Sequence, residues 1–222
     1  MGAPVAGDLD EGVSRSAAPA GTHRAGVGCL SPDRRAGLCR WHGRALIAPP
    51  FYHDGTERPI GRPLDEEEQE IYYSGKRKDH TLKNVLVVDE AGYVRFLSAT
   101  YEGKAHDKRI ADEAQYQLPE GSQLAQDTAF QGFSLPEVTI LQPKKKPPKG
   151  SLTPEEKAEN QRISAIRVHI EHSIGSVKIY RIVHDVIRHW CPWIRDQVMY
   201  ICCGLHNLRL RQRMADQVTS QP

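Results

Sequence analysis

The segment VLVVDEAGYVRFL, residues 85–97, decides the fold class of this chain. Two apolar runs, residues 85–88 and 93–97, flank the short polar segment 90–92. Gly92 permits the backbone conformation that a tight turn requires. Apolar runs joined by such a turn are typical of a β-hairpin, so we expect two antiparallel strands here.

Further sheet elements are expected on the C-terminal side of the hairpin. Residues 106–114 read as a helix, and the short apolar segments 124–126 and 138–141 read as buried strands. The resulting order is strand, hairpin, helix, strand, strand. It predicts an α/β fold with a mixed sheet and a crossover connection.

The first strand of this sheet is expected to be short. Pro49 and Pro50 precede it, and proline cannot donate a hydrogen bond within a sheet. We therefore expect the strand to begin near Phe51 and to lead into residues 54–56, Asp-Gly-Thr. Asp-Gly is also a common turn sequence, so an ordinary turn is an alternative interpretation of this segment.

Two long helices are expected in the C-terminal part of the chain. Thr153 suits an N-cap, Pro154 suits the first helical position, and Glu156 completes a capping-box pattern. Isoleucines then recur at steps of three and four residues, which indicates an amphipathic helix. A last helix is expected over residues 193–214.

Composition indicates one folded domain with irregular ends. The chain has 222 residues, of which 39% are hydrophobic and 26% are charged, enough for one packed core. We assign residues 1–45, rich in Gly, Ala, Arg and Pro, to an irregular extension, residues 46–214 to the domain and residues 215–222 to a flexible tail. The sequence contains no membrane-length apolar run, and its five cysteines form no CxxC pair. We therefore expect neither a disulfide scaffold nor a structural zinc site. The cysteine usage fits a protein of a reducing compartment.

The net charge of +2 conceals an uneven distribution. Acidic residues exceed basic ones over residues 54–142, and the balance reverses over residues 144–213. A carboxylate-lined site beside a cationic surface would suit an enzyme that acts on a polyanion. Two differently charged solvent-exposed faces are the alternative.

Three acidic residues occupy positions that suggest metal chemistry. Asp54 follows the first strand, Asp127 ends a buried strand, and Glu171 lies on the long helix beside the isoleucine stripe. Carboxylates brought together repel one another unless a cation binds, and Mg²⁺ or Mn²⁺ prefers such hard oxygen ligands. Taken singly, each has an ordinary alternative: a turn for Asp54, an N-cap for Asp127, and a helix ion pair with Arg167 for Glu171.

The three acidic residues belong to a longer series of seven sequence segments that spans about 160 residues. They are DGTERPI (54–60), YSGK through HTLKN (73–84), GKAHDK (103–108), QDTAFQG (126–132), QPKKKP (142–147), residues 160–172, and CGLHNLR (203–209). In these segments the chain resembles the DDE transposases of the IS5 group, with the Harbinger-like DDE endonucleases as wider relatives.

The resemblance implies a ribonuclease-H-like fold and a catalytic site. Its three catalytic acids, which bind Mg²⁺ or Mn²⁺, fall on Asp54, Asp127 and Glu171. Such enzymes hydrolyse a DNA strand at the element end and transfer the freed 3′-hydroxyl to target DNA. Asp107 is the rival for the second acid and could equally be a helix N-cap, whereas His172 could hydrogen-bond a ligand carboxylate or be a surface histidine.

The resemblance also implies DNA as the partner. We expect contacts to phosphates from the basic loop after the last strand and from the catalytic helix: Lys144, Lys145, Lys146, Lys149, Arg167 and Lys178. A homo-oligomer on DNA in the bacterial cytoplasm, associated with the nucleoid and with no membrane, is expected. Residues 1–45 do not resemble the family's helix-turn-helix segment, so a separate upstream polypeptide could supply it. The alternative function is a catalytically inactive remnant that only binds DNA or a protein.

Overall fold

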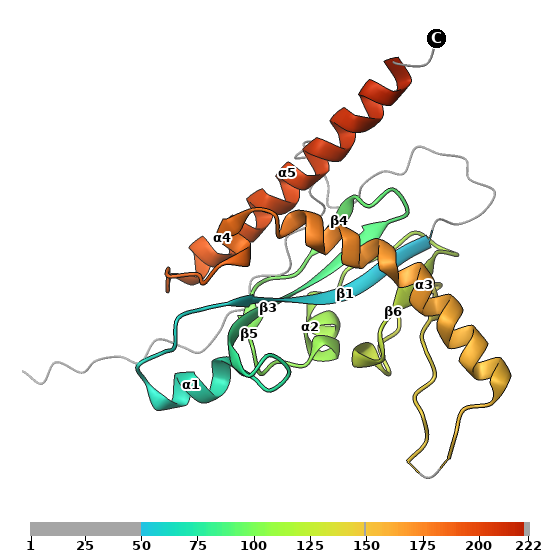
Figure 1. Cartoon of the computed structure of the whole chain (residues 1–222), viewed down its shortest axis with the longest axis horizontal. Helices are drawn as coiled ribbons and strands as arrows, with labels where there is room; N and C mark the ends of the chain where they lie inside the picture. The colour runs from blue at the N-terminus through green and yellow to red at the C-terminus, as the bar shows by residue number, and fades with distance from the viewer. Residues whose placement is uncertain (1–49, 149, 220–222) are drawn as a thin grey trace, which may run out of the picture.

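A mixed sheet with helices on both faces forms the body of the protein (Figure 1). The computed structural model describes residues 50–148 and 150–219. The extension assigned to residues 1–45 therefore lies outside the described residues. The strands are β1 (Pro50–Pro59), β2 (Tyr73–Ser74), β3 (Asp79–Asp89), β4 (Val94–Leu97), β5 (Tyr101–Glu102), β6 (Gln123–Gln126) and β7 (Thr139–Leu141).

The strand order places β1 in the middle of the sheet. Strand β3 pairs with β1 in antiparallel orientation and carries β4 as its other hairpin arm. On the opposite side β6 is parallel to β1, and β7 is parallel to β6. This order is the ribonuclease-H-like arrangement, so the expected fold class is confirmed, together with the hairpin at residues 85–97.

Strand β3 shows why the sheet is covered on both faces. Val85 and Val87 belong to one apolar core with Ile110 of helix α2 (Asp107–Ala114). Leu86 and Val88 belong to a second core, which includes residues of α3 (Pro154–Val177) and α5 (Pro192–Thr219). Because side chains alternate along a strand, a run of four apolar residues buries two on each face.

The remaining helices are short. Helix α1 (Glu66–Tyr72) and strand β2 lie in the connection between β1 and β3. A 3₁₀ turn, η1 (Thr128–Phe130), follows β6, and α4 (Arg181–His184) connects α3 to α5. Within the described ranges no helix is long and apolar enough to cross a membrane.

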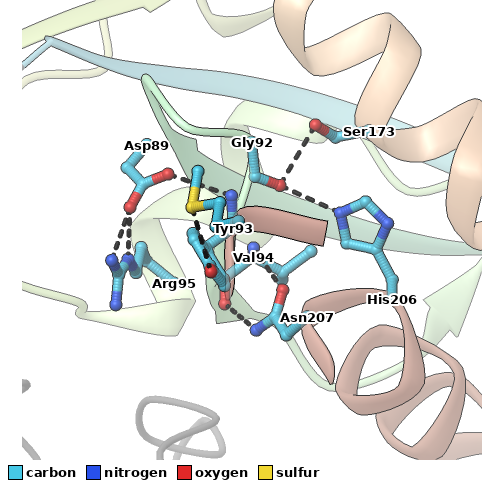
Figure 2. A network of polar contacts seen from close by, with 9 residues as sticks. Asp89, Gly92, Tyr93, Val94, Arg95, Ser173, His206 and Asn207 are labelled. Carbon is cyan, nitrogen blue, oxygen red and sulfur yellow. Dashed lines mark hydrogen bonds and ion pairs between the residues drawn. The ribbon is translucent and has the colours of Figure 1, made fainter. Parts of the chain in front are cut away.

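Polar contacts fix α3 and α5 to the β3–β4 turn (Figure 2). Asn207 accepts a hydrogen bond from Val94 N and donates one to Val94 O, both at 2.9 Å. The Nε2 of His206 lies 2.9 Å from Gly92 O, which also accepts a hydrogen bond from Ser173 Oγ at 3.2 Å. These contacts hold in place the helix that carries Glu171, two residues before Ser173.

Two boundaries differ from the sequence-based expectation. Strand β1 begins near Phe51 as expected but is not short, because it continues through Asp54-Gly55-Thr56 to Pro59 and pairs with β3 over this length. Pro50 is tolerated because it is the first residue of the strand. Helix α5 runs to Thr219, so residues 215–219, assigned above to a flexible tail, are helical. Residues 220–222 are not among those described.

Gly103 gives a prediction about stability. A Cβ atom there would overlap the Tyr72 carbonyl oxygen and lie 2.5 Å from Thr81 Oγ1. Since a backbone atom cannot move aside as a flexible side chain can, Gly103→Ala should lower the free energy of unfolding by about 1–3 kcal/mol or more. Urea denaturation would measure this. Gly61→Ala is the control, because a Cβ at Gly61 meets nothing within 4 Å, and equal losses for both variants would contradict the packing.

Candidate active site

The sheet register brings Asp54 and Asp127 together. His53 on β1 is paired with Gln126 on the parallel strand β6, and each acidic residue is the next residue along its chain. Neighbouring strands of a sheet lie about 4.8 Å apart, so the two backbones are adjacent. The side chain of Asp54 is 22% exposed and that of Asp127 is 36% exposed, so both carboxylates remain partly accessible.

Local geometry fixes each of these carboxylates. The Gly55 N–H donates to Asp54 Oδ1 at 2.8 Å, within the strand rather than within a turn. Asp127 is the N-cap of η1, and its Oδ1 accepts from Thr128 N at 2.6 Å. The capping role that was an alternative for Asp127 is therefore present, and it also holds the carboxylate at the end of β6.

A guanidinium lies between the two carboxylates. Arg167 on α3 approaches Asp54 Oδ2 at 3.8 Å and Asp127 Oδ1 at 3.4 Å. Its side chain is 11% exposed, and among the described residues its buried Nε has no hydrogen-bond partner. The expected DNA-binding role of Arg167 thus meets a competing contact, because in this conformation the guanidinium is held by two acids.

The environment of Asp54 disfavours its ionised form. The pKa of Asp54 is raised to about 6, chiefly by burial; Arg167 and the Gly55 N–H act against the rise, and the nearby Asp127 and Asp107 add to it. A carboxyl whose charge is destabilised by burial and by neighbouring acids gains most from a bound cation.

Glu171 faces the same cleft as Asp54. A cleft of about 330 Å³ is lined by both residues, by the strand segment around Gly55 and by Asp107. Glu171 is exposed and lies on α3 one turn after Arg167. The structure therefore joins Asp54 to Glu171 through a shared cleft and Asp54 to Asp127 through a shared guanidinium.

Asp107, the rival second acid, is also near Asp54 but has a different partner. Lys83 Nζ lies 3.2 Å from Asp107 Oδ1, and a Cβ on Gly55 would lie 3.0 Å from the Asp107 carboxyl. The N-cap of α2 is His106, so the interpretation of Asp107 as an N-cap is wrong. Its carboxylate is neutralised by a lysine, whereas Asp127 shares a cation with Asp54.

The other expected site residues are dispersed. His172 is exposed, and within residues 50–148 and 150–219 it has no hydrogen bond to a carboxylate. Lys144 Nζ pairs with Glu156 at 3.1 Å, Lys145 and Lys146 are exposed, and Lys149 lies outside the described residues. Lys178 lines the cleft and donates from Nζ to Glu57 O at 2.9 Å.

Two basic cleft residues were missed from the sequence. Lys76 and Arg77, in the turn between β2 and β3, line the cleft that contains Asp54 and Glu171. A signal was present, because this turn lies within the segment YSGK to HTLKN that carries part of the family resemblance. The 17 residues between Thr56 and Ser74 separate the turn from Asp54 in the sequence, so only the fold brings them together.

The donor set fits divalent metal ions, with Arg167 in the position of a stand-in cation. Three carboxylates with oxygen donors are the ligands that Mg²⁺ and Mn²⁺ prefer. In the described part of the chain no three Asp, Glu, His or Cys side chains are already arranged around one point as metal ligands. The guanidinium between Asp54 and Asp127 shows that this position attracts positive charge.

Arg167 therefore supports a prediction about metal affinity. Arg167→Gln should tighten Mn²⁺ binding by about tenfold, roughly 1.4 kcal/mol, because a competing and repelling positive charge is removed. Isothermal titration with MnCl₂ would measure the change. Arg162→Gln is the matched control, since Arg162 pairs with Glu159 on the exposed face of the same helix. Weaker Mn²⁺ binding by the Arg167 variant would show that the guanidinium does not compete with the ion.

Comparisons with known proteins place the chain in a family. Residues 53–207 match the family profile described as DDE superfamily endonuclease. A probable transposase for insertion sequence element IS702 from Microchaete diplosiphon is 30% identical over 135 residues, which are 61% of this chain and 48% of that protein. The chain thus spans about half the length of this curated relative. No solved structure matches.

Proposed function

Because this chain belongs to the DDE superfamily endonucleases, we propose that it cleaves DNA strands at the ends of a transposable element and joins them to target DNA. The observation that carries the proposal is that Asp54 on β1 and Asp127, the residue after the parallel neighbour β6, contact one guanidinium, with Glu171 in the cleft of Asp54. DNA is its substrate and partner, and the bacterial cytoplasm at the nucleoid is its proposed location. Assembly as a homo-oligomer on DNA, with an upstream polypeptide supplying the helix-turn-helix part, belongs to the same proposal.

Asp54, Asp127 and Glu171 would hold Mg²⁺ or Mn²⁺. When bound, the ions would activate a water molecule to attack the phosphorus and would stabilise the 3′-oxygen that leaves as the P–O3′ bond breaks. The protein's own part is to place three carboxylates on rigid supports: Asp54 within β1, Asp127 at the cap that follows β6, and Glu171 on a long helix. Arg167 offsets part of the charge of Asp54 and Asp127, as a cation held by these residues would.

Basic residues around the cleft would bind the DNA backbone. Lys178 stands at the cleft wall, and Lys145 and Lys146 are exposed on the loop between β7 and α3. Contacts to phosphates add affinity that falls with salt and position the strand without reading its sequence.

A nicking assay with the full chain tests the proposal. The substrate is a supercoiled plasmid that carries the DNA flanking the coding sequence on both sides, incubated with MgCl₂, MnCl₂ or EDTA. We expect nicked circles with either metal and none with EDTA. DNA binding without metal-dependent nicking would favour the alternative function, a remnant that binds but does not cleave.

A further inference from the structure

The cleft that contains the carboxylates continues into a second cleft. The second one, of about 370 Å³, is lined by Pro59, Asp79, Thr81 and His184 in addition to the residues it shares with the first. Glu57, Arg77 and Lys178 line both clefts. The two clefts therefore share these three residues, and we treat the pair as one groove that extends from Asp54 and Glu171 to His184. We call it the exit groove.

The acidic residue at the junction, Glu57, is only partly compensated, because it shares its lysine with a second acid. Glu57 Oε2 accepts a hydrogen bond from Thr81 Oγ1 at 3.1 Å, and its Oε1 lies 3.8 Å from Lys83 Nζ. Asp107, in the first cleft, shares the same lysine. Lys83 is 14% exposed, so it compensates these acids from beneath the groove rather than from within it.

The two cations at the junction have no carboxylate partner. Lys178 donates to the main-chain oxygen of Glu57, and Arg77 forms no ion pair within the described residues. Burial lowers the pKa of Lys178, and the positive charge of nearby Arg77 lowers it further. The carboxylates of Glu57 and Asp54 partly offset the charge of Lys178, but among the described residues neither cation has a carboxylate within ion-pair distance. Two adjacent positive charges of this kind can attract an anion.

The turn that carries Arg77 is held in shape by the backbone. Ser74 Oγ accepts from Arg77 N at 3.3 Å, and Ser74 O accepts from Lys78 N at 2.7 Å. Lys78 has a φ of 55°. This tight turn projects Arg77 to the groove, whereas Lys78, the next residue, lines neither cleft.

We propose that the exit groove binds the sugar–phosphate backbone of the DNA strand adjoining the cleaved phosphate, with Arg77 and Lys178 contacting its phosphates. A groove that starts at the carboxylates and continues past two unpaired cations is suited to a polyanionic chain extending beyond the reacting group. The inference rests on the proposed function for the position of the reacting phosphate. The binding of DNA by Arg77 can be measured without cleavage.

Fluorescence anisotropy in EDTA tests the groove. The probe is a 5′-fluorescein-labelled single-stranded 20-mer, and the proteins are the full-length wild type, Arg77→Ala and Lys78→Ala. We expect Arg77→Ala to weaken binding about five- to tenfold at 0.1 M NaCl and to reduce the log–log salt slope by about one phosphate contact. Lys78→Ala removes the same charge from the same turn and should change the affinity less than twofold.

The outcomes separate this inference from the proposed function. Equal affinities for wild type and Arg77→Ala, or equal losses in the two variants, would overturn the exit groove even if the wild type nicks plasmid DNA. A selective loss in Arg77→Ala would support the groove even if no nicking occurs. Circular dichroism melting of both variants checks the fold, and Arg77→Lys should recover most of the lost affinity because it restores the charge.

Discussion

Replacing Asp127 with asparagine should lower metal-dependent DNA cleavage by more than about 100-fold, since loss of partners outside the ligand sphere of a metal site already costs ten- to a hundredfold. Asparagine keeps an oxygen that can accept the hydrogen bond from Thr128 N, so the cap of η1 and the fold should persist. The variant therefore loses the negative charge and the carboxylate ligand at position 127, while the side chain keeps nearly the same shape. Initial rates of plasmid nicking in MgCl₂ would measure the effect.

Two other variants make this test specific. Asp112→Asn removes a carboxylate on α2 that pairs with Lys108 away from the cleft, and it should nick DNA like the wild type. Asp107→Asn tests the rival second acid. If cleavage disappears in Asp107→Asn but survives in Asp127→Asn, the second catalytic acid is Asp107 and our assignment is wrong.

His53 should make the fold sensitive to acid. Its ring is fully buried against Phe130, with ring centroids 3.9 Å apart, and burial lowers the pKa of His53 to about 3. The folded state therefore binds fewer protons than the unfolded state between about pH 6.5 and 3, and stability falls as the pH falls through this range. The full effect is about 4–5 kcal/mol, and about 2 kcal/mol of it should be lost by pH 5.

The adjacent Asp54 acts in the opposite direction. Because the pKa of Asp54 is raised to about 6, the folded state holds this proton more tightly, and that contribution to stability is lost as the pH rises from about 4 through 6. A single pH titration of the wild type would mix the two effects. The difference between wild type and His53→Phe isolates the histidine, since Asp54 is present in both.

Urea denaturation at pH 7 and pH 5 provides the measurement. His53→Phe loses the contact between His53 and the Tyr116 hydroxyl, which costs stability at both pH values. Relative to the wild type, however, it should gain about 2 kcal/mol on going from pH 7 to pH 5. If the free energies of unfolding of the two proteins differ by the same amount at pH 7 and pH 5, His53 is not buried in its neutral form.

The sequence predicted those parts of the fold whose signals are local. The hairpin at residues 85–97 and the helix that begins after Thr153 are present, and Thr153 and Glu156 form the expected reciprocal cap. The strand ending before Asp127 is also present. Each depends on neighbouring residues alone, such as an apolar alternation or a capping pattern.

Features set by contacts distant in sequence could not be predicted. Asp54-Gly55 resembles a turn, but pairing with Leu86 and Val85 of β3 makes it the middle of a strand. Arg167 was expected to pair with Glu171 or to contact DNA, but its contact with Asp54 and Asp127 depends on how α3 crosses the sheet. The position of Arg77 in the groove likewise depends on how the chain between β1 and β3 folds.

Binding of Mn²⁺ to the full-length protein tests the central claim most directly, because that claim is the meeting of three carboxylates around metal ions. Electron paramagnetic resonance of free Mn²⁺ would give the affinity of the wild type, Asp54→Asn, Asp127→Asn and Glu171→Gln, with Asp112→Asn as the control. The account predicts that each of the first three substitutions weakens binding at least about tenfold and that the control does not. If Glu171→Gln or Asp127→Asn binds Mn²⁺ as tightly as the wild type, the three carboxylates do not form one metal site.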